Sequence, residues 1–207
     1  MLPAGPAIRT VVSLPLAIGH DDHIPAEVIT FTGLSDNSEH IALRLGTSIA
    51  RRPLVRLHSE CLTGDVFGSA RCDCGPQLTE AVRRIYAAGG IVLYLRQEGR
   101  SIGLYNKLDA YQLQDRGLDT YEANTRLGLP EDGRSYRAAA EMLHALGADD
   151  IDLLTNNPDK AAQLINYGIR VRQVSRTGVF VTPSNRRYLE AKVLRHHHDM
   201  NLEKTPA

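Results

Sequence analysis

The stretch GPQLTEAVRRIYAAGGIVLYL, residues 75–95, sets the expected fold because it places a helix directly before a buried strand. Leu78, Val82 and Ile85 recur at the spacing of one helix face, and Gly89 stands where a C-terminal cap belongs. The apolar run IVLYL that follows, bounded by glycine and charge, predicts a buried strand. A helix that leads into such a strand is typical of an α/β core.

The same alternation continues on both sides of this stretch. The runs PLVRLH, IDLLT and IRVRQV predict further strands, and helices are expected at about 102–116, at 135–147 behind a Ser135 cap and at 157–168, with a loop at 116–130. Near the N-terminus, VVSLPL, EVITFTG and HIALRLG predict short strands separated by polar turns. We therefore expect an α/β (α+β) fold, in which an N-terminal antiparallel β region packs with an α/β core of largely parallel pairing.

The length of the chain favours a single compact domain. At 207 residues it can form one sizeable core but is short for two independent domains. We expect one domain over 1–207, with the β region at about 8–50, the core at about 51–175 and a charged helical tail at about 185–203. Three successive histidines in that tail, His196–His198, would point in different directions on a helix, so a solvated helix end is favoured over a metal site.

The charge balance excludes several classes of partner. The 24 basic and 24 acidic residues give a net charge of zero, so no global field attracts nucleic acid or an anionic membrane. The N-terminal apolar stretch is broken by prolines and ended by charges, which fits neither a signal peptide nor a membrane span. We expect a cytoplasmic protein that binds neither nucleic acid nor a membrane and that holds any polyanion with a local cluster of cations.

All three cysteines, Cys61, Cys72 and Cys74, lie in the loop HSECLTGDVFGSARCDCG. In a reducing compartment such thiols are better metal ligands than disulfide partners, although a redox pair of Cys72 and Cys74 stays an alternative. In extended backbone, the C-x-C step puts two thiolates on one side, and the loop can fold the third back toward them. Three thiolates with one open position fit a catalytic zinc site, in which the pKa of a bound water falls toward ~7.

A structural zinc site is an equally good interpretation of this spacing. His58 lies three residues before Cys61, so H-x-x-C together with the other two cysteines would complete a closed Cys3His site. The spacing alone leaves the catalytic and structural interpretations open.

Polar residues at fixed places follow the cysteine loop, in LYLRQEGRSIGLYNKLDAYQLQDRGLDTYEANTRLG and then in LLTNNPDK. Together with RLHSECLTGDVFGSARCDCGPQL, they make the chain resemble GTP cyclohydrolase II, the enzyme that opens riboflavin biosynthesis, most densely from Arg56 to Lys160. The resemblance implies zinc-dependent hydrolysis of GTP to 2,5-diamino-6-(5-phosphoribosylamino)pyrimidin-4(3H)-one, with release of formate and pyrophosphate.

The resemblance also implies the metals and the assembly. Cys61, Cys72 and Cys74 would bind one Zn2+ per subunit, and Mg2+ would accompany the triphosphate. His58 would then belong to the nucleotide pocket, so the structural site would lose its fourth ligand. The family implies a homodimer.

Three catalytic residues follow only from the resemblance. By its place in NKLDAYQLQD, Tyr111 would protonate or orient the leaving nitrogen, whereas taken alone it would be a ring packed on the core. Asp132 would accept a proton, and Arg134 would act as nucleophile on the α-phosphate, although LPEDGRS taken alone is a solvated turn. Because a guanidinium stays protonated, charge stabilisation by Arg134 is the firmer expectation.

The resemblance places the substrate among a larger set of residues. Arg56, Arg100 and Lys160 would hold the triphosphate, because the chain has no P-loop motif. Either Glu60 or Glu98 would accept from the guanine N1 and N2 donors, and the sequence does not decide between them. The full set of implied GTP-binding residues is Arg56, Leu57, His58, Ser59, Glu60, Gln77, Glu98, Gly99, Arg100, Thr120, Thr155 and Lys160.

Two alternatives to this function stay open. The first is a relative with the same fold that stops at the formylamino pyrimidine, although the presence of Tyr111 favours full release of formate. The second is a zinc-stapled nucleotide-binding or RNA-binding module without catalysis. The neutral charge, three phenylalanines and absence of tryptophan give such a module few stacking platforms.

Overall fold

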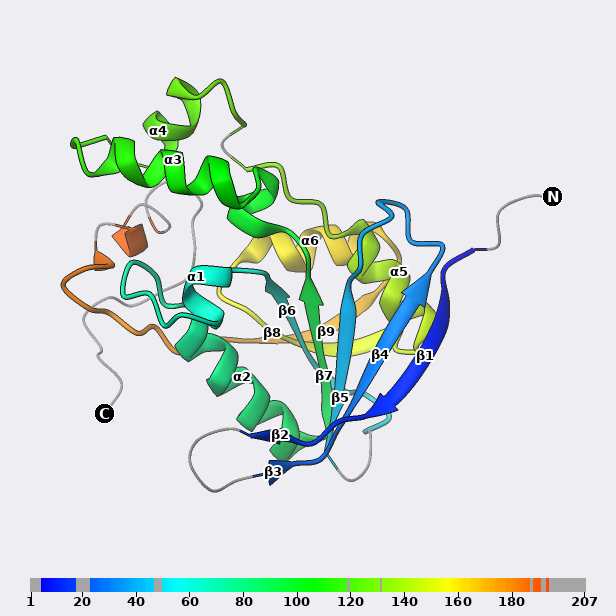
Figure 1. Ribbon diagram of the computed structural model, residues 1–207. Helices are drawn as coiled ribbons and strands as arrows, with labels where there is room; N and C mark the ends of the chain where they lie inside the picture. Colours follow the sequence, from blue (N-terminus) through cyan, green and yellow to red (C-terminus); the bar gives the residue numbers. More distant parts are fainter. Residues whose placement is uncertain are drawn as a thin grey trace. The chain divides into compact units, whose positions relative to one another are not determined.

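The computed structural model describes residues 5–17, 23–46, 50–118, 120–130, 132–186, 188–190 and 193 (Figure 1). Its residues divide into two compact units, each assembled from separate segments. The first unit contains Met1–His58, Thr79–Leu95 and Ser135–Thr177, and the second contains Ser59–Leu78, Arg96–Arg134 and Gly178–Ala207. Both units draw on both halves of the chain, so neither is a consecutive domain.

A seven-stranded sheet with the order β1-β4-β5-β7-β6-β8-β9 lies in the first unit. Antiparallel pairing joins β1 to β4, β4 to β5 and β5 to β7, whereas β6 pairs with β8 and β8 with β9 in parallel. The strands are β1 (Ala7–Ser13), β4 (Ala26–Thr32), β5 (Ile41–Leu45), β6 (Leu54–Ser59), β7 (Gly90–Leu95), β8 (Asp150–Leu154) and β9 (Arg170–Ser175). A short antiparallel ribbon pairs β2 (Leu16–Ala17) with β3 (His23–Ile24).

The mixed sheet confirms the predicted α/β class. The N-terminal antiparallel strands extend the same sheet as the parallel strands, because β5 pairs with β7 along its whole length. The parallel pairings predicted for the core are present between β6 and β8 and between β8 and β9. The alternation of helices and strands predicted the parallel strands. The short N-terminal runs separated by polar turns predicted the antiparallel strands.

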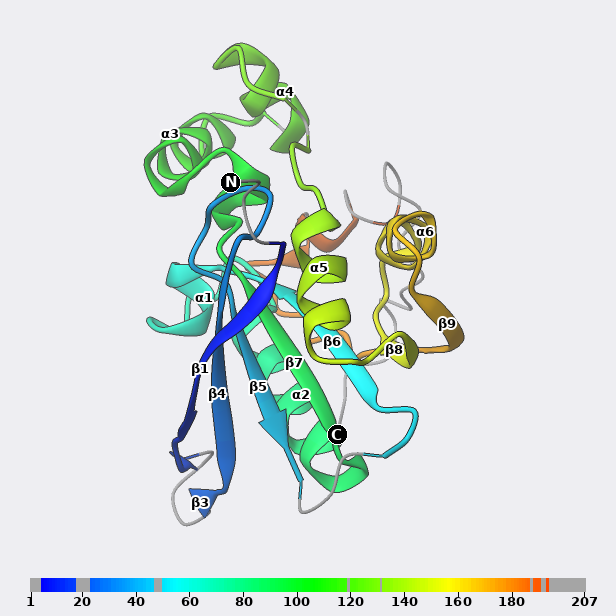
Figure 2. The ribbon, with the colours of Figure 1, turned by 90° about the vertical axis from the view of Figure 1, so that its right-hand side faces the viewer.

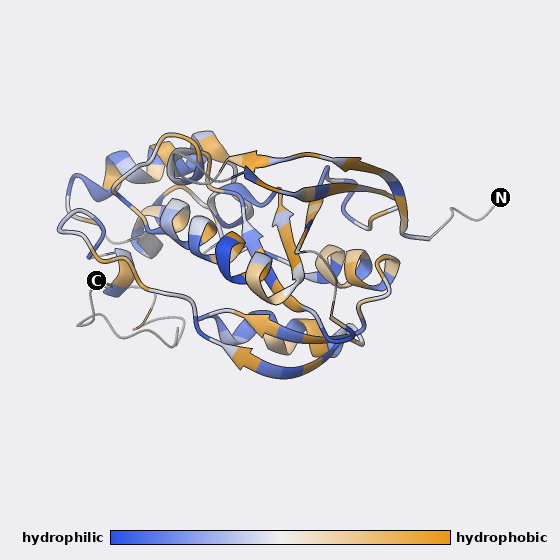
Figure 3. Ribbon diagram, turned by 90° about the horizontal axis from the view of Figure 1, so that it is seen from below, coloured by the Kyte–Doolittle hydropathy of each residue, from blue (hydrophilic) through white to orange (hydrophobic). Residues whose placement is uncertain are grey.

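Helices cover both faces of the sheet. Figures 1 and 2 show α2 (Cys74–Ala88) on one face, and α5 (Arg137–Ala145) with α6 (Pro158–Asn166) on the other. In β7 every second residue, Ile91, Leu93 and Leu95, joins the core cluster that contains Met142 and Leu143 of α5. The strand is buried, as predicted, and the burial extends to both of its faces. Figure 3 shows apolar stretches along the strands of the sheet.

The predicted helix ends are largely confirmed. Val82 and Ile85 of α2 are buried, and the helix gives way to Gly89 with a φ of +73°. Asn157 caps α6 by accepting a hydrogen bond from the Asp159 N–H at 3.0 Å. The helix α5 begins one residue later than expected, because Tyr136 is its N-cap, although the predicted cap Ser135 still accepts from the Arg137 N–H.

The second unit is mainly helical and departs further from expectation. It contains α1 (Leu62–Asp65), the 3-10 turn η1 (Glu98–Ser101), α3 (Leu104–Gln114) and α4 (Thr120–Arg126). The helix expected from about 102 is α3, whose start is set by Gly103 with a φ of +89°. The prediction of a loop across 116–130 is wrong because α4 lies there.

The missed helix has a simple physical reason. In α4 the described buried residues are Ala123 and Asn124, so the segment lacks the apolar period that marks an amphipathic helix. Most of the predicted tail helix at 185–203, including His196–His198, lies outside the described residues. Within the described part of the chain, none of the helices has the length and apolar character needed to cross a bilayer.

A histidine fastens the end of α5 to the loops that follow it. The ring of His144 lies 2.6 Å from Asp149 Oδ1 through Nδ1 and 3.0 Å from the Tyr167 carbonyl oxygen through Nε2. A carboxylate and a carbonyl can only accept, so both ring nitrogens donate and the imidazole is cationic. The Tyr167 carbonyl, followed by Asp149, raises the pKa of His144 above its ordinary value.

This geometry makes part of the stability depend on pH. Because the pKa of His144 is raised on folding, its contribution is complete below the unfolded pKa and is lost as the pH rises through the folded pKa. The side chains of His144 and Asp149 are both about half exposed, so solvent weakens their interaction. We therefore expect His144→Asn to lower the free energy of unfolding by less than about 1 kcal/mol near pH 5 and by almost nothing near pH 9. Urea denaturation of both proteins at the two pH values measures this. An equal cost at both would contradict it.

Candidate metal and nucleotide site

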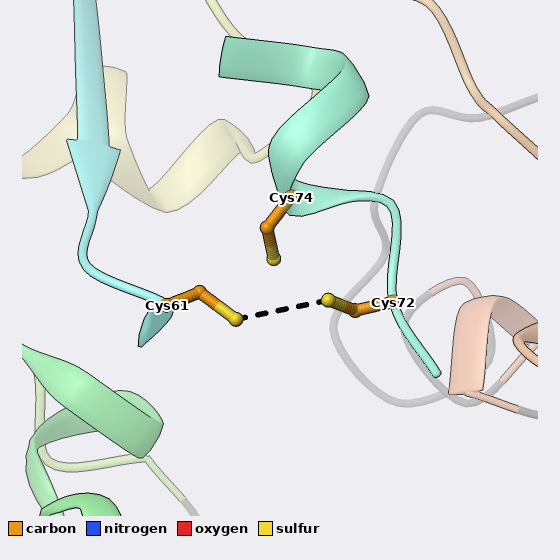
Figure 4. A group of neighbouring side chains, drawn as sticks. All are labelled: Cys61, Cys72 and Cys74. Atoms are coloured by element: carbon orange, nitrogen blue, oxygen red, sulfur yellow. Dashed lines mark hydrogen bonds between the residues drawn. The ribbon is translucent and has the colours of Figure 1, made fainter. Parts of the chain in front are cut away.

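Three thiols converge where β6 ends and α2 begins. Cys61 lies between β6 and α1, Cys74 is the first residue of α2, and Cys72 lies two residues before it (Figure 4). The three Sγ atoms lie within 4.8 Å of one another, with 3.7 Å between those of Cys61 and Cys72. All three are free cysteines, and two of them are buried. The predicted ligands are therefore brought together in the second unit.

The spacing of the sulfurs fits a metal and not a disulfide. Thiolates bound to tetrahedral zinc at about 2.3 Å stand about 3.8 Å apart, whereas disulfide sulfurs are about 2.0 Å apart. Soft thiolate donors also suit zinc better than they suit cations that prefer oxygen ligands. Within the described residues, the group that could hold a metal consists of the three cysteines without His58.

The backbone geometry of the C-x-C step differs from the extended form assumed from the sequence. Cys74 already belongs to α2, so the two side chains converge through a turn that enters a helix, not through the alternation of a strand. The turn α1 brings the third sulfur into place, with the Asp65 N–H donating to the Cys61 carbonyl oxygen at 2.7 Å. The Asp65 carboxylate in turn accepts from the Cys61 N–H at 3.0 Å.

Gly64 is required for this close approach. A Cβ atom at Gly64 would lie 2.7 Å from Cys72 Sγ and 3.1 Å from Cys61 Sγ. Both separations are shorter than a carbon and a sulfur tolerate, and the thiols are held by the turn and the helix. Because Gly64 has no side chain, the sulfurs of Cys72 and Cys61 can lie close to its Cα.

Lys107 contacts the cluster directly and was not singled out from the sequence. Its Nζ donates to Cys61 Sγ at 3.2 Å, to Thr63 Oγ1 at 3.0 Å and to Glu98 Oε1 at 2.9 Å. Burial alone would lower the pKa of Lys107, but Tyr111, Glu98 and Cys61 raise it above its ordinary value, so the ammonium keeps its proton. The neighbouring thiols, followed by Lys107, hold the pKa of Cys61 far below its usual range.

The predicted catalytic tyrosine lies beside this lysine. The centroid of the Tyr111 ring is 5.8 Å from Lys107 Nζ and 4.5 Å from Arg71 Cζ. Arg71 is itself held by Asp115, with NH2 donating to Oδ1 at 2.6 Å and NH1 to Oδ2 at 3.2 Å. Burial raises the pKa of Tyr111 above its ordinary value, so its hydroxyl stays protonated near neutral pH and can donate a proton.

The turn η1 connects the thiol cluster to the loop that carries two further predicted residues. Glu98 accepts from Lys107 and from the Gly99 N–H through Oε1, and from the Leu62 N–H at 2.7 Å through Oε2. Arg100 and Ser101 have φ values of +63° and +71°, a left-handed backbone that is uncommon for residues other than glycine. The Arg100 carbonyl accepts from the Gly133 N–H at 3.1 Å.

Asp132 and Arg134 form an ion pair with each other. The Arg134 Nε donates to Asp132 Oδ1 at 2.9 Å, and NH2 donates to Oδ2 at 2.5 Å. Burial alone would raise the pKa of Asp132, but its hydrogen bonds with Arg134 outweigh that effect and lower the pKa below its ordinary value. The carboxylate is therefore ionised near neutral pH. The second candidate for the guanine contact, Glu60, also has an arginine partner, since Arg96 Nε donates to its Oε2 at 2.8 Å.

Predicted substrate residues of the first unit gather at the carboxyl ends of the parallel strands β6 and β8. Lys160 Nζ donates to the Leu57 carbonyl oxygen at 2.7 Å, and Arg56 NH1 donates to the Leu154 carbonyl oxygen at 3.2 Å. Thr155 Oγ1 accepts from the Asn157 N–H at 3.0 Å. Ligands of α/β proteins bind at such strand ends.

The remaining predicted residues are distributed as follows. His58, in the first unit, stacks on the Tyr94 ring with centroids 5.5 Å apart. Ser59 ends β6 in the second unit, and there Gln77 donates to Asp73 Oδ2 at 2.6 Å. Thr120 begins α4, and its side chain lies outside the described residues. The predicted set therefore falls into a first-unit group and a second-unit group.

Comparison with known proteins places this arrangement in a family. Residues 12–176 match the family model described as GTP cyclohydrolase II. A GTP cyclohydrolase-2 of Aliivibrio fischeri is 50% identical over 193 residues, 92% of this chain and 96% of the relative, and one of Vibrio cholerae is 50% identical over 187 residues, 89% and 94%. The Riboflavin biosynthesis protein RibBA of Bacillus cytotoxicus is 51% identical over 176 residues, 84% of this chain and 44% of that protein. The resemblance inferred from the motifs is confirmed.

The contact at Gly64 gives a direct test of the thiol cluster. We expect Gly64→Ala to lose most of its bound zinc after dialysis, because the new methyl group would displace the sulfurs of Cys72 and Cys61. Gly133→Ala is a matched control in the same unit, since its Cβ would meet only ordinary contacts of 3.5 Å or more. Zinc content per chain, measured by elemental analysis, should stay at the wild-type value in the control. Full zinc content in Gly64→Ala would contradict the expected crowding.

Proposed function

The chain belongs to the GTP cyclohydrolase II family of enzymes, and from this premise we propose that it hydrolyses GTP in a zinc-dependent reaction. The products would be 2,5-diamino-6-(5-phosphoribosylamino)pyrimidin-4(3H)-one, formate and pyrophosphate, at the entry to riboflavin biosynthesis. The observation that carries the proposal is the cluster of three buried or half-buried thiols with Lys107 and Tyr111 beside it. A binding module would need no such proton donor next to its metal ligands.

Cys61, Cys72 and Cys74 of each subunit would together hold one zinc ion. Three protein ligands leave one position of a tetrahedral ion for another group, which is the arrangement of catalytic zinc sites. When bound, zinc supplies Lewis-acid activation of water for attack on C8 of guanine. The family resemblance is also the basis for proposing a homodimer.

Tyr111 is proposed as the proton donor to the leaving nitrogen. Its half-buried phenol stays protonated near neutral pH, and the cations of Arg71 and Lys107 lie against its ring. Asp115, the residue that follows α3, holds Arg71 through two hydrogen bonds. The guanidinium that contacts the Tyr111 ring is therefore itself held in place. A group fixed in this way can transfer its proton without first reorganising.

Asp132 and Arg134 are proposed to act on the phosphate end of GTP. The ionised Asp132 can accept a proton, and the Arg134 guanidinium can stabilise charge as pyrophosphate leaves. Arg56, Arg100 and Lys160 would supply further cations, with Mg2+ bridging phosphate oxygens. Glu98 already accepts three hydrogen bonds from this chain, which supports Glu60 as the carboxylate that contacts guanine.

Product analysis tests this function. Zinc-loaded protein incubated with GTP and Mg2+ should release formate and pyrophosphate in step with the diaminopyrimidine, as followed by mass spectrometry and separate assays of the two small products. A formylamino pyrimidine with pyrophosphate but no formate would assign the chain to the variant that stops early. Unchanged GTP in the presence of bound zinc would contradict catalysis and favour a binding module.

Removal of the Tyr111 hydroxyl separates the two steps. We expect Tyr111→Phe to release formate at least about 100-fold more slowly, because the proton donor is lost while the ring still packs against Arg71. Pyrophosphate release should persist, and the formylamino pyrimidine should accumulate. The exposed Tyr105→Phe in the same helix is the control and should match the wild type. Equal loss of formate and pyrophosphate in Tyr111→Phe would argue against a role confined to the release of formate.

A further inference from the structure

The ammonium group of Lys107 is fully occupied within the second unit. It has three N–H bonds, and they are directed at three acceptors: Cys61 Sγ, Thr63 Oγ1 and Glu98 Oε1. The side chains of Lys107 and Glu98 are each about one-tenth exposed. A buried cation with no spare donor is poorly suited to bind a substrate phosphate, so its function must lie in what it already contacts.

The contact with Cys61 matters because of the charge that the thiols carry when they hold a metal. Three thiolates and one divalent cation leave a net charge of minus one in a largely buried site, and burial of uncompensated charge is costly. The thiolates also donate electron density, which weakens a metal as a Lewis acid. A cation that donates a hydrogen bond to one sulfur offsets both effects, as partners of metal ligands commonly do.

We propose that Lys107 is a positioning residue that tunes the metal–thiolate site through its hydrogen bond to Cys61 Sγ. The ammonium withdraws charge from that sulfur and stabilises the metal-loaded form over the form with protonated thiols. The inference rests on the proposed metal site, but its test measures metal binding and metal absorption, not turnover of GTP.

Glu98 aims this lysine at the sulfur. Its Oε1 accepts from Lys107, while its Oε2 accepts from the N–H of Leu62, the residue that follows Cys61. The carboxylate therefore ties α3 and the start of α1 to the same point. Thr63 Oγ1 lies 3.0 Å from Lys107 Nζ and 3.8 Å from Cys61 Sγ, which closes the arrangement on the remaining side.

The competing explanation is that Lys107 is only the partner of Glu98 in a buried ion pair. Two substitutions separate these roles, because both break the ion pair but only one removes the donor to sulfur. Lys107→Met deletes the N–H···S bond. Glu98→Gln keeps an amide oxygen that can accept from Lys107, so the ammonium can still contact Cys61.

The test uses the protein loaded with Co2+, whose sulfur-to-cobalt charge-transfer absorption reports on the thiolates, and competition with a chelator for Zn2+. We expect Lys107→Met to shift that absorption to lower energy, because the sulfur becomes richer in electrons, and to bind Zn2+ about 10- to 100-fold more weakly. Glu98→Gln should keep the wild-type absorption and an affinity within a few-fold of wild type. Circular dichroism of both loaded proteins monitors folding.

Several results would overturn the inference. Equal changes in the two variants would assign Lys107 to the ion pair alone, and a wild-type spectrum and affinity in Lys107→Met would remove any role at the sulfur. If Lys107→Met does not fold, Lys107→Leu removes the same donor to sulfur, and an unshifted spectrum in that variant would also overturn the inference. A wild type that binds Co2+ through thiolates but leaves GTP unchanged would overturn the proposed function and not this inference.

Discussion

A buried ammonium group must have an acceptor for each of its protons, and the second unit is organised around that constraint at Lys107. The three acceptors come from Cys61 of the cysteine loop, from the turn α1 and from the turn η1, while Lys107 itself comes from α3. Segments separated by more than forty residues in sequence are thus fixed to one point. The same contact places a positive charge beside the sulfurs and near the ring of Tyr111.

In the first unit, a strand of the sheet carries two of the predicted substrate residues. The strand β6 is buried along most of its length and pairs in parallel with β8, so Arg56 and His58 lie on a rigid element. Three residues after His58 the chain reaches Cys61, the first thiol. Rigid strands that end in functional loops are a general way to position side chains without making the whole protein rigid.

Periodic signals made most of the fold predictable. Val82 and Ile85 of α2 recur at helical spacing, and β7 is a continuous apolar run, so both elements followed from the sequence. The helix α4 did not, since Ala123 and Asn124 give it no apolar stripe. The thiol cluster was predicted for a partly mistaken reason, because the C-x-C step lies at a helix start. Lys107 could not be found from pattern at all, since lysines are rarely buried and its significance lies in contacts across the sequence.

The turn η1 links the two halves of the proposed reaction more closely than sequence separation suggests. Glu98, at its first position, accepts hydrogen bonds from Lys107 and from the Leu62 N–H. Two residues later, the carbonyl of Arg100 accepts from Gly133, which lies between Asp132 and Arg134. Non-glycine residues in a left-handed conformation cost of order 1 kcal/mol each, and such a cost persists where the surroundings fix it. Here the fixed point is the carbonyl direction of Arg100, which a relaxed backbone would turn away from Gly133. The turn η1 therefore contacts both the residue that follows Cys61 and the residue between Asp132 and Arg134.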